Sequence, residues 1–520
     1  MRIGIGGRWP WIAAMSLTAL AGSACLARSG GRPNETPVVA TDAGAVRGAE
    51  ADGIAWFKGI PYAAPPVGPL RWRPTAPAQP WQGVRDARAF GAICPQPEQA
   101  KRAGRPQSED CLTLNVASPK PGGNGKAPVL VLVHGGAYFV GSSADGFDDA
   151  ARIFTKRGIV VVAPNYRLGR LGFFAHPGLR AEQPDAPVAN YWLMDQIAAL
   201  RWVKRNIAAF GGDPARVTIL GCSAGGSSIN ALMASPKARG LFAAAQAHSG
   251  GGINNATRPL ARAEQEGIVF AQRAGVTGEG GDAIARLRAL TPAAVLAADP
   301  GAPNFGAIID GVYLKEEIAR SFAEGRAARV PFVAGSTSNE ASIFGLMAFD
   351  EAVLKQRFDI DLEEARPAYD PAGTMPRAEL LRQVETDFLF TAGATGLAGL
   401  AAKWQPAYAY HFAYVPPVQR SEMPGAPHCA DMRYTFGDPE VPEDAESRRV
   451  AALLEDSLEH FVKTGDPNGT GVPGWPRYTA PEFAPLVVDR ETAAVPGFRK
   501  RQIDYWLGRW SRETGIAYPR

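Results

Sequence analysis

A serine flanked by glycines stands where a catalytic nucleophile is expected. Residues 217–226 read VTILGCSAGG, in which an apolar run predicts a buried strand and a helix-forming stretch begins near Ala224. In a G-x-S-x-G turn between a strand and a helix, the serine is held clear of the sheet at a helix N-terminus, whose dipole favours developing negative charge. Ser223 is therefore a candidate nucleophile, and it needs a base to take its proton.

Only six histidines occur in the chain, so the base can be sought by elimination. One of them, His428, lies in the loop GAPHCADM after the last long predicted strand, where the chain order nucleophile, acid, histidine places the base. The other five fit structural positions in a turn, a strand, an amphipathic stretch and two loops or strand ends (His134, His411, His460, His176 and His248). We therefore predict that His428 takes the proton of Ser223.

A glycine-rich turn, VHGGAYFVG at residues 133–141, follows the first strong predicted strand. Backbone N–H groups of such a turn, together with the N–H after the nucleophile, can bind the oxyanion of a tetrahedral intermediate. Glycine suits this position because the backbone must approach the substrate closely. The predicted donors are Gly136, Ala137 and Ala224, while Tyr138 and Phe139 either line an aromatic acyl site or pack in the core.

The acid of the triad is sought among carboxylates between the serine and the histidine. Glu340 stands just beyond a predicted strand in VPFVAGSTSNEAS. Catalytic groups of open α/β sheets gather at the carboxyl ends of the strands, which favours Glu340. Taken by itself, a surface glutamate is an equally good interpretation of this position.

The elements around these residues predict an α/β fold with a mostly parallel sheet flanked by helices. Near-continuous apolar runs at residues 129–133, 159–163 and 217–220 are typical of strands buried on both faces. Later strands are predicted at 330–334 and at 407–415, the second from an alternating pattern. Longer stretches of helical periodicity separate the strands, as the crossovers of a parallel sheet require.

Bulk composition narrows the classes of function. The 520 residues are 46% hydrophobic and 20% charged, a globular composition with enough apolar residues for a large core. The formal charge of +4 is small and the two signs are interspersed, so no nucleic-acid partner is predicted. Neither an H-E-x-x-H motif nor a cysteine and histidine cluster occurs, so no metal or other cofactor is expected.

The first residues read as a targeting segment. Arg2 and Arg8 precede an apolar stretch at residues 9–21, and small residues follow it, as in a secretory signal peptide. We predict a signal peptide over residues 1–27 and a linker over 28–35, with the mature protein periplasmic or secreted. A membrane span is disfavoured because it needs roughly 20 apolar residues. A lipid anchor at Cys25 is an alternative, although Gly22 stands where lipoprotein signals usually have leucine.

Several motifs together resemble the type-B carboxylesterase family, which includes the cholinesterase-like lipases. They are FKGIPYAAPPVGPLRWRPT from Phe57, EDCLTLNV from Glu109, NYRLGRLGFF from Asn165, FGGDPARVTILGCSAGG from Phe210 and KTGDPNG from Lys463. The resemblance runs from about Thr36 to Trp506 and implies a single α/β-hydrolase domain over residues 36–520. It also implies that Glu340 is the triad acid and His428 the base.

The same resemblance implies structural roles for several polar residues. Arg71 with Glu109, and Arg167 with Asp195, resemble buried ion pairs of the family rather than catalytic groups. Ser249, in AHSGG, resembles a serine that lies near the triad acid.

By the same resemblance, Cys94 and Cys111 form a disulfide that closes a small loop. The remaining pair, Cys222 and Cys429, departs from the commonest family pattern, and each cysteine is adjacent to a catalytic residue. If the nucleophile and the base meet, their neighbours come within disulfide range, so we expect a Cys222–Cys429 bond. This arrangement resembles the Cys-Ser and His-Cys pairing of the tannase and feruloyl esterase family. Two buried free thiols are the alternative.

The predicted function is that of a serine carboxylic-ester hydrolase that acts on a small-molecule ester through an acyl-enzyme intermediate. A lipase and an esterase of phenolic or aromatic esters, such as feruloyl esters, are the enzymatic alternatives. Some cholinesterase-like proteins only bind or adhere, but they commonly lack the nucleophile. Because all three triad positions are occupied here, a binding protein without activity is disfavoured.

Overall fold

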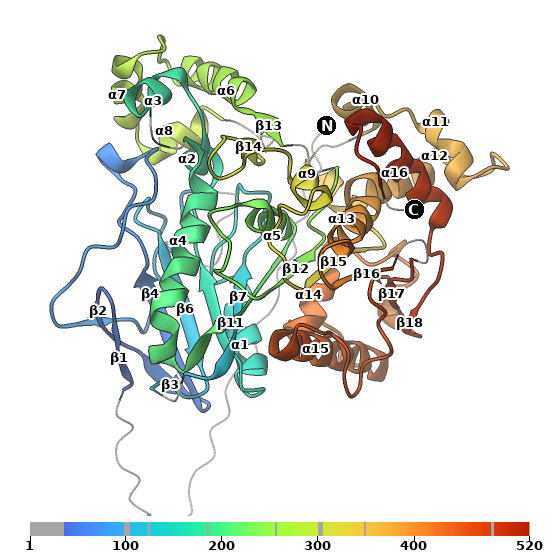
Figure 1. Cartoon of the computed structure of the whole chain (residues 1–520), viewed down its shortest axis with the longest axis horizontal. Coiled ribbons are helices and arrows are strands. Elements are labelled where there is room, and N and C mark those ends of the chain that lie inside the picture. The colour runs from blue at the N-terminus through green and yellow to red at the C-terminus, as the bar shows by residue number, and fades with distance from the viewer. Residues whose placement is uncertain are drawn as a thin grey trace, which may run out of the picture. The chain divides into compact units, whose positions relative to one another are not determined.

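Parallel strands form the centre of the fold, as the apolar runs predict (Figure 1). The computed structural model describes residues 36–97, 104–122, 125–184, 186, 188–254, 257–299, 305–347, 350–479 and 483–518. The predicted signal peptide, the linker and Cys25 lie outside the described residues. Residues from Thr36 onwards form one compact unit.

The main sheet has 11 strands, and the parallel ones lie in its middle. Antiparallel pairs occur at both ends, where β18 pairs with β17 and where β3, β4 and β6 lead to β8. In spatial order the strands are β18 (Ala493–Ala494), β17 (Leu486–Val488), β16 (Ala407–Phe412), β15 (Phe332–Thr337), β12 (Ala244–His248), β11 (Gly212–Cys222), β7 (Ala127–Val133), β8 (Val160–Pro164), β6 (Thr113–Ser118), β4 (Ile54–Pro61) and β3 (Ala49–Ala51).

Three smaller sheets and a set of helices surround the main sheet. The small sheets are β1 (Val38–Thr41), β2 (Gly44–Arg47) and β5 (Val84–Asp86); β9 (Phe173–Phe174) and β10 (Ala189–Asn190); β13 (Arg258–Pro259) and β14 (Ile308–Ile309). The α-helices are α1 (Phe147–Phe154), α2 (Gly169–Gly172), α3 (Pro177–Glu182), α4 (Tyr191–Asn206), α5 (Ala224–Ala234), α6 (Leu260–Arg273), α7 (Gly281–Arg288), α8 (Pro292–Ala297), α9 (Ile318–Ala323), α10 (Glu351–Phe358), α11 (Leu362–Tyr369), α12 (Arg377–Thr386), α13 (Ala392–Ala402), α14 (Ala430–Thr435), α15 (Ala445–Thr464) and α16 (Lys500–Thr514). Shorter helical turns are η1 (Gly68–Leu70), η3 (Ile207–Phe210), η4 (Glu340–Met347), η6 (Pro417–Gln419) and the π-turn η5 (Asp387–Thr391).

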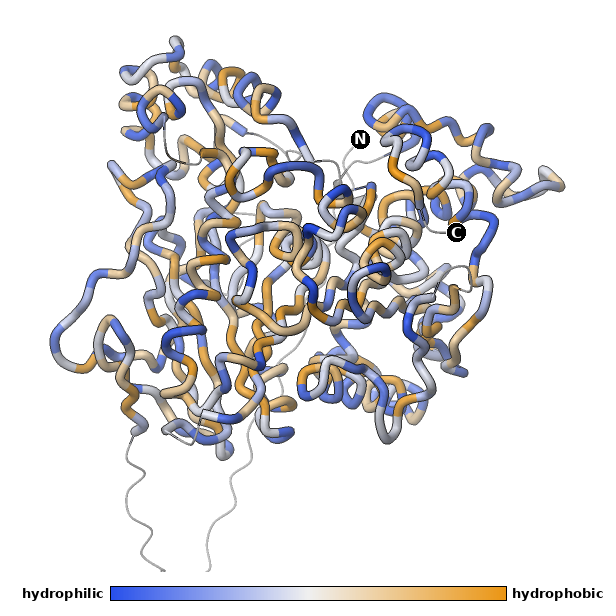
Figure 2. Tube along the Cα trace, in the orientation of Figure 1, coloured by the Kyte–Doolittle hydropathy of each residue, from blue (hydrophilic) through white to orange (hydrophobic). Residues whose placement is uncertain are grey.

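Helices cover both faces of the sheet, and alternate residues of each central strand point to opposite sides. In β7, Val129 and Val131 join the cluster that includes residues of α4, α5 and α13, whereas Leu130 and Leu132 join the cluster formed with α1 and α15. Hydrophobic residues accordingly run along the central strands, while the outer helices alternate between hydrophobic and hydrophilic (Figure 2). The continuous apolar run therefore reflects burial on two faces.

The boundaries of the predicted strands differ from the structure, most clearly in the two later strands. The strand expected at 330–334 begins at Phe332 and continues to Thr337. It does not begin earlier because Pro331 has no N–H to donate. Only the carbonyl of Pro331 takes part in a hydrogen bond, from the Ala245 N–H at 3.0 Å. The strand expected at 407–415 ends at Phe412. All six residues of β16 are buried, so its alternating sequence does not mark a solvent face.

Candidate active site

Ser223 occupies a strained turn between β11 and α5. Its φ of 59° and ψ of −126° lie where side-chain-bearing residues are rarely found, and its backbone N–H donates to the His248 carbonyl at 3.0 Å. The flanking glycines are required by space: a Cβ on Gly225 would lie 2.2 Å from the Val133 carbonyl oxygen, and one on Gly221 would lie 2.8 Å from the same atom. The G-x-S-x-G spacing thus allows β7 to pass close beneath the serine.

Glu340 and His428 meet at the carboxyl end of β15. Glu340 begins η4 directly after this strand, its side chain is fully buried, and it accepts a hydrogen bond from Nδ1 of His428. Its second oxygen accepts the Thr337 backbone N–H at 2.7 Å. Both carboxylate oxygens therefore have donors, which fixes the orientation of the carboxylate towards the imidazole.

The loop that carries His428 is joined to the loop that carries the acid. The two loops form a parallel bridge between Asn339 and Pro427, and the Asn339 N–H donates to the Ala426 carbonyl at 2.9 Å. The His428 N–H donates to Ser342 Oγ at 2.9 Å. Because backbone contacts hold both loops, the pairing of histidine and glutamate does not depend on side chains alone.

The other ring nitrogen of His428 is available for proton transfer. The histidine side chain is 7% exposed, and its Nε2 has no hydrogen-bond partner among the described residues. Because Nδ1 donates to Glu340, the neutral ring leaves Nε2 as the proton acceptor. The ring of Phe390 lies edge-on to the imidazole, with centroids 5.1 Å apart, and limits the space around it.

A disulfide joins the turn of the nucleophile to the loop of the histidine. Cys222 and Cys429 are bonded, with their Cα atoms 6.1 Å apart. One cysteine immediately precedes Ser223 and the other immediately follows His428. The bond therefore brings together the two chain segments on which the nucleophile and the base are predicted, although these segments lie 207 residues apart in the sequence.

The glycine-rich turn lies against the serine turn. A Cβ on Gly135 would lie 3.3 Å from Ser223 Cβ, and one on Gly136 would lie 2.1 Å from the Val140 carbonyl oxygen. Gly136 and Ala137 both have positive φ, of 102° and 53°. Ala224 opens α5, where a backbone N–H has no partner within the helix. These three N–H groups are therefore carried by two turns that lie close together beside the nucleophile.

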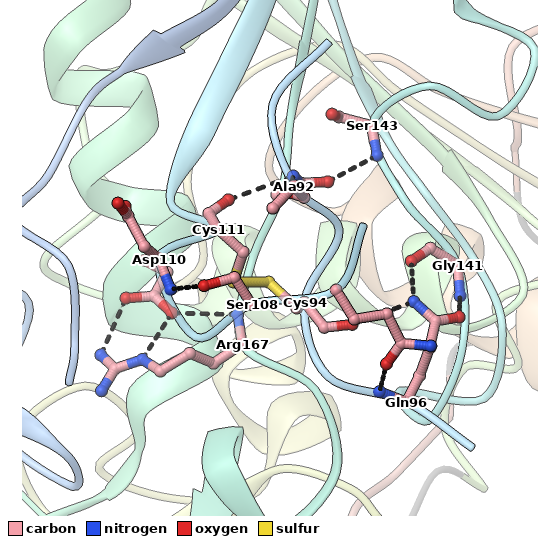
Figure 3. The surroundings of a disulfide bond; sticks show 12 residues. Ala92, Cys94, Gln96, Ser108, Asp110, Cys111, Gly141, Ser143 and Arg167 are labelled. Atoms are coloured by element: carbon pink, nitrogen blue, oxygen red, sulfur yellow. Dashed lines mark hydrogen bonds and ion pairs between the residues drawn. A yellow bond between two sulfur atoms is a disulfide. The ribbon is translucent and has the colours of Figure 1, made fainter. Parts of the chain in front are cut away.

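The second disulfide supports the far end of the glycine-rich turn (Figure 3). Cys94 and Cys111 are bonded, as the family resemblance implies. Two residues after Cys94, the Gln96 amide donates to the Gly141 carbonyl at 3.0 Å and accepts from the Gly141 N–H at 3.0 Å. This pair of bonds holds the loop of the disulfide against the last residue of the turn.

Tyr138 is a packing residue, whereas Phe139 is only partly buried. The Tyr138 ring lies 4.9 Å from both Phe173 and Trp192, and burial raises the pKa of its hydroxyl well above 10, so the group stays neutral. Phe139 stacks on Phe305 with centroids 6.3 Å apart. Of the two aromatic residues in the glycine-rich turn, only Phe139 is therefore partly exposed to solvent.

The polar residues assigned by resemblance occupy buried positions. Arg71 and Glu109 form an ion pair at 2.7 Å, as do Arg167 and Asp195. Ser249 is buried and has a φ of 42°, but its hydroxyl has no hydrogen-bond partner among the described residues. The structure therefore has no hydrogen bond from the Ser249 hydroxyl to Glu340.

One of the five remaining histidines, His248, belongs to a buried hydrogen-bonded cluster that the sequence did not predict. His248 ends β12 and its Nδ1 lies 2.7 Å from Asp431 Oδ2, while the Tyr410 hydroxyl donates to the same oxygen at 2.6 Å. The other four take part in local contacts: ring stacking on Tyr166, a cap of α3, a bond to Ser336 and a contact with the Thr470 carbonyl (His134, His176, His411 and His460). Of the five, His248 has the carbonyl that accepts the Ser223 N–H.

The described residues contain neither a metal-binding cluster nor a helix that could span a membrane. No group of three or more histidine, cysteine or carboxylate side chains is arranged to hold a metal ion there. Across the same part of the chain, no helix combines the length and the apolar content that a membrane crossing requires.

Comparison with known proteins finds that the chain is similar to esterases. A family model described as the carboxylesterase family matches residues 35–374 and 371–506. The chain is 33% identical over 470 residues to the fumonisin B1 esterase of Sphingopyxis macrogoltabida, which covers 84% of each chain. It is 32% identical over 490 residues to the para-nitrobenzyl esterase of Bacillus subtilis, which covers 89% of this chain and 98% of that one.

Solved structures agree with the sequence relatives. A PNB esterase superimposes with a TM-score of 0.78 at 30% identity and covers 90% of this chain and 100% of that one. A carboxylesterase of Geobacillus stearothermophilus superimposes with a TM-score of 0.78 at 32% identity and covers 90% of this chain and 99% of that one. The similarity thus extends over nearly the whole of both chains.

Proposed function

Since the chain belongs to the carboxylesterase family and is a serine carboxylic-ester hydrolase, we propose that Ser223, His428 and Glu340 are its catalytic triad. The observation that carries this assignment is the state of His428: Nδ1 is bound to Glu340, while Nε2 is buried without a partner among the described residues. A histidine held in this way is prepared to take a proton at Nε2.

In the proposed reaction, Ser223 Oγ attacks the ester carbonyl carbon as its proton passes to Nε2 of His428. The tetrahedral oxyanion receives hydrogen bonds from the N–H groups of Gly136, Ala137 and Ala224. The bond to the alcohol oxygen then breaks, and the histidine returns the proton to the leaving alcohol. Water, deprotonated by the same histidine, attacks the acyl-enzyme, releases the carboxylic acid and regenerates the serine hydroxyl.

The test is kcat/KM of the mature protein on p-nitrophenyl esters from acetate to laurate and on a feruloyl ester. Ser223→Ala should abolish turnover of every ester. Ser235→Ala, at the opposite end of α5, is the matched control and should retain it. Turnover that survives Ser223→Ala would contradict the assignment of the nucleophile, and a preference for laurate would identify a lipase.

Esters with an aromatic group are a narrower candidate substrate. Phe390 lies edge-on to the imidazole of His428, and Phe139 follows the proposed oxyanion donors, so an aromatic ring of the substrate would find an aromatic neighbour on either side of the scissile bond. One relative is a para-nitrobenzyl esterase, which points the same way. Phe390→Leu should then lower kcat/KM for p-nitrobenzyl acetate more than for ethyl acetate, and equal losses would argue against this preference.

Export from the cytosol is also part of the proposal. Two disulfides are typical of proteins that mature outside the reducing cytosol, and residues 1–27 have the pattern of a signal peptide. Mass spectrometry of the protein recovered from the periplasm or medium should find an N-terminus near residue 28. A mature chain that begins at Cys25 with added lipid mass would instead show anchoring, and an intact Met1 would contradict export.

A further inference from the structure

We propose that His248, Asp431 and Tyr410 form a positioning network that keeps the nucleophile turn and the histidine loop in register. The proposal rests on the triad assigned above. It concerns groups that do not touch the substrate and that act through the placement of Ser223 and His428.

The three side chains meet at one carboxylate oxygen. Asp431 Oδ2 lies 2.7 Å from His248 Nδ1 and 2.6 Å from the Tyr410 hydroxyl oxygen. The hydroxyl oxygen of Tyr410 and Nδ1 of His248 are also 2.6 Å apart. On the other side of the imidazole, Nε2 lies 2.9 Å from Gln246 Oε1. All four residues are less than 9% exposed, so these polar groups are removed from water and bond to one another, whereas Asp431 Oδ1 has no hydrogen-bond partner among the described residues.

Gly335, which has no side chain, leaves the space that the Tyr410 ring occupies. In the sheet, His248 of β12 is paired with Gly335 of β15, and Gly335 is paired in turn with Tyr410 of β16. A Cβ on Gly335 would lie 2.1 Å from a ring carbon of Tyr410. The tyrosine therefore crosses above the middle strand at its glycine and reaches a histidine two strands away.

Each end of the network is attached to a catalytic segment. His248 is paired with Cys222 at the end of β11, and its carbonyl accepts the N–H of Ser223 at 3.0 Å. Asp431 lies in the first turn of α14, three residues after His428. The network thus spans the same interval as the Cys222–Cys429 disulfide, with hydrogen bonds in place of a covalent bond.

The hydrogen bonds around Asp431 stabilise its carboxylate. Asp431 and Gln246 each present an oxygen to a ring nitrogen of His248. Burial by itself raises the pKa of Asp431, but the hydrogen bonds from His248 and Tyr410 outweigh it and hold this pKa below 3.8. Loss of either donor would leave a buried carboxylate short of hydrogen bonds, and α14 would shift to find new ones.

The test uses the full-length mature enzyme with p-nitrophenyl acetate. Asp431→Asn and His248→Ala should lower kcat by about tenfold or more with KM changed by less than about twofold, because hydrogen bonds to a charged group are lost without contact to the substrate. His248→Asn places an amide N–H near the position of Nδ1 and should recover most of kcat. His248→Gln, whose amide reaches the position of Nε2, should recover less.

A control substitution at a second buried tyrosine, Tyr414, distinguishes a loss of stability from a loss of positioning. Tyr414 is also buried, and its hydroxyl bonds to Ser447 at 3.1 Å. Tyr410→Phe and Tyr414→Phe should lower the thermal midpoint by similar amounts, but only Tyr410→Phe should lower kcat. The comparison of these two tyrosine variants tests the positioning role even if Asp431→Asn does not fold.

The proposal is overturned if Tyr410→Phe retains the kcat of Tyr414→Phe, or if His248→Asn is as slow as His248→Ala. In either case, the triad assignment would remain intact if Ser223→Ala abolishes the turnover that the wild-type enzyme shows. Turnover that persists in Ser223→Ala would contradict the triad itself, whatever the network variants do.

Discussion

At the scale of single residues, Glu340 illustrates how a buried carboxylate serves a histidine. One oxygen accepts the His428 Nδ1–H, and the other is occupied by the Thr337 N–H at 2.7 Å. The carboxylate therefore selects the tautomer in which Nε2 is the acceptor, and in the proposed reaction it would stabilise the imidazolium that forms when the serine gives up its proton. An amide of the same shape could keep the packing but not the charge.

Glu340→Gln should therefore lower kcat by roughly 10³-fold or more while the protein remains folded, since the charge that stabilises the imidazolium is removed. Steady-state kinetics on p-nitrophenyl acetate would measure this loss. Glu363→Gln, on the exposed side of α11 with a side chain 53% exposed, is the control and should change kcat little. Equal rates for Glu340→Gln and the wild type would remove the glutamate from the triad.

A second residue-scale prediction concerns pH and His411. Burial, and secondarily the charge of Arg499, lower the pKa of His411 to about 3. Between about pH 6.5 and pH 3 the unfolded chain therefore binds a proton that the folded chain does not. The free energy of unfolding should fall with decreasing pH by up to about 1.4 kcal/mol per unit from this group alone.

His411→Gln should flatten that dependence. Urea unfolding at pH 7 and pH 5 would give a smaller difference for His411→Gln than for the wild type, whereas His460→Gln, on the outer part of α15, should keep the wild-type difference. Parallel curves for the wild type and His411→Gln would show that this histidine is not the group responsible.

Single residues also show what could be predicted from the sequence. His428 was predicted to be the base because few histidines exist and because the order along the chain limits where a base can lie. The contact between His248 and Asp431 could not be found in that way, since the two residues are 183 positions apart and belong to elements whose packing is not encoded locally. The local signal was Gly335 in a buried strand, because a glycine there indicates that another group packs closely against the backbone, here the Tyr410 ring.

At the scale of elements, the strand–turn–helix around the nucleophile depends on close contact between backbones. The Cβ that Gly225→Ala introduces would lie 2.2 Å from the Val133 carbonyl oxygen, so α5 or β7 would have to move. We expect a stability loss of about 1–3 kcal/mol and a fall in kcat, because the serine moves with α5. Gly474→Ala, which meets no atom within 4 Å, is the matched control in thermal unfolding and kinetics.

Element boundaries were predicted less well than the elements themselves. Apolar runs located β7, β8 and β11 because strands buried on both faces leave no polar interruption. The start of β15 was misplaced because hydrophobicity continues through Val330 and Pro331, where the ladder has not yet begun. Hydrogen bonding, not hydrophobicity, decides where a strand starts.

At the scale of the whole molecule, the two disulfides differ in the length of chain that they close. Cys94–Cys111 spans 17 residues and Cys222–Cys429 spans 207. Chain-entropy arguments give about 3 kcal/mol for the first and about 5 kcal/mol for the second as upper values. The longer closure also joins the two halves of the active site.

Replacing both Cys222 and Cys429 by serine should therefore lower the thermal midpoint more than the same change at Cys94 and Cys111, and it should also lower kcat. Calorimetry and steady-state kinetics on the two double variants would measure both effects. If the variant without the long closure keeps full kcat, backbone contacts and hydrogen bonds suffice to hold the histidine loop, and the disulfide serves stability alone.

The order of the strands has a consequence for synthesis on the ribosome. Every strand from β3 to β12 in the main sheet is translated before residue 250, and β15, β16, β17 and β18 then join the open edge one after another, in the order in which they are made. A nascent chain that ends after β12 carries Ser223, the proposed nucleophile, without the proposed acid Glu340 or the proposed base His428. It also presents an unpaired strand edge, which other chains could join. Catalytic competence therefore arrives late in translation, only once α14 has emerged, and the half-made sheet is the species that a chaperone would have to shield.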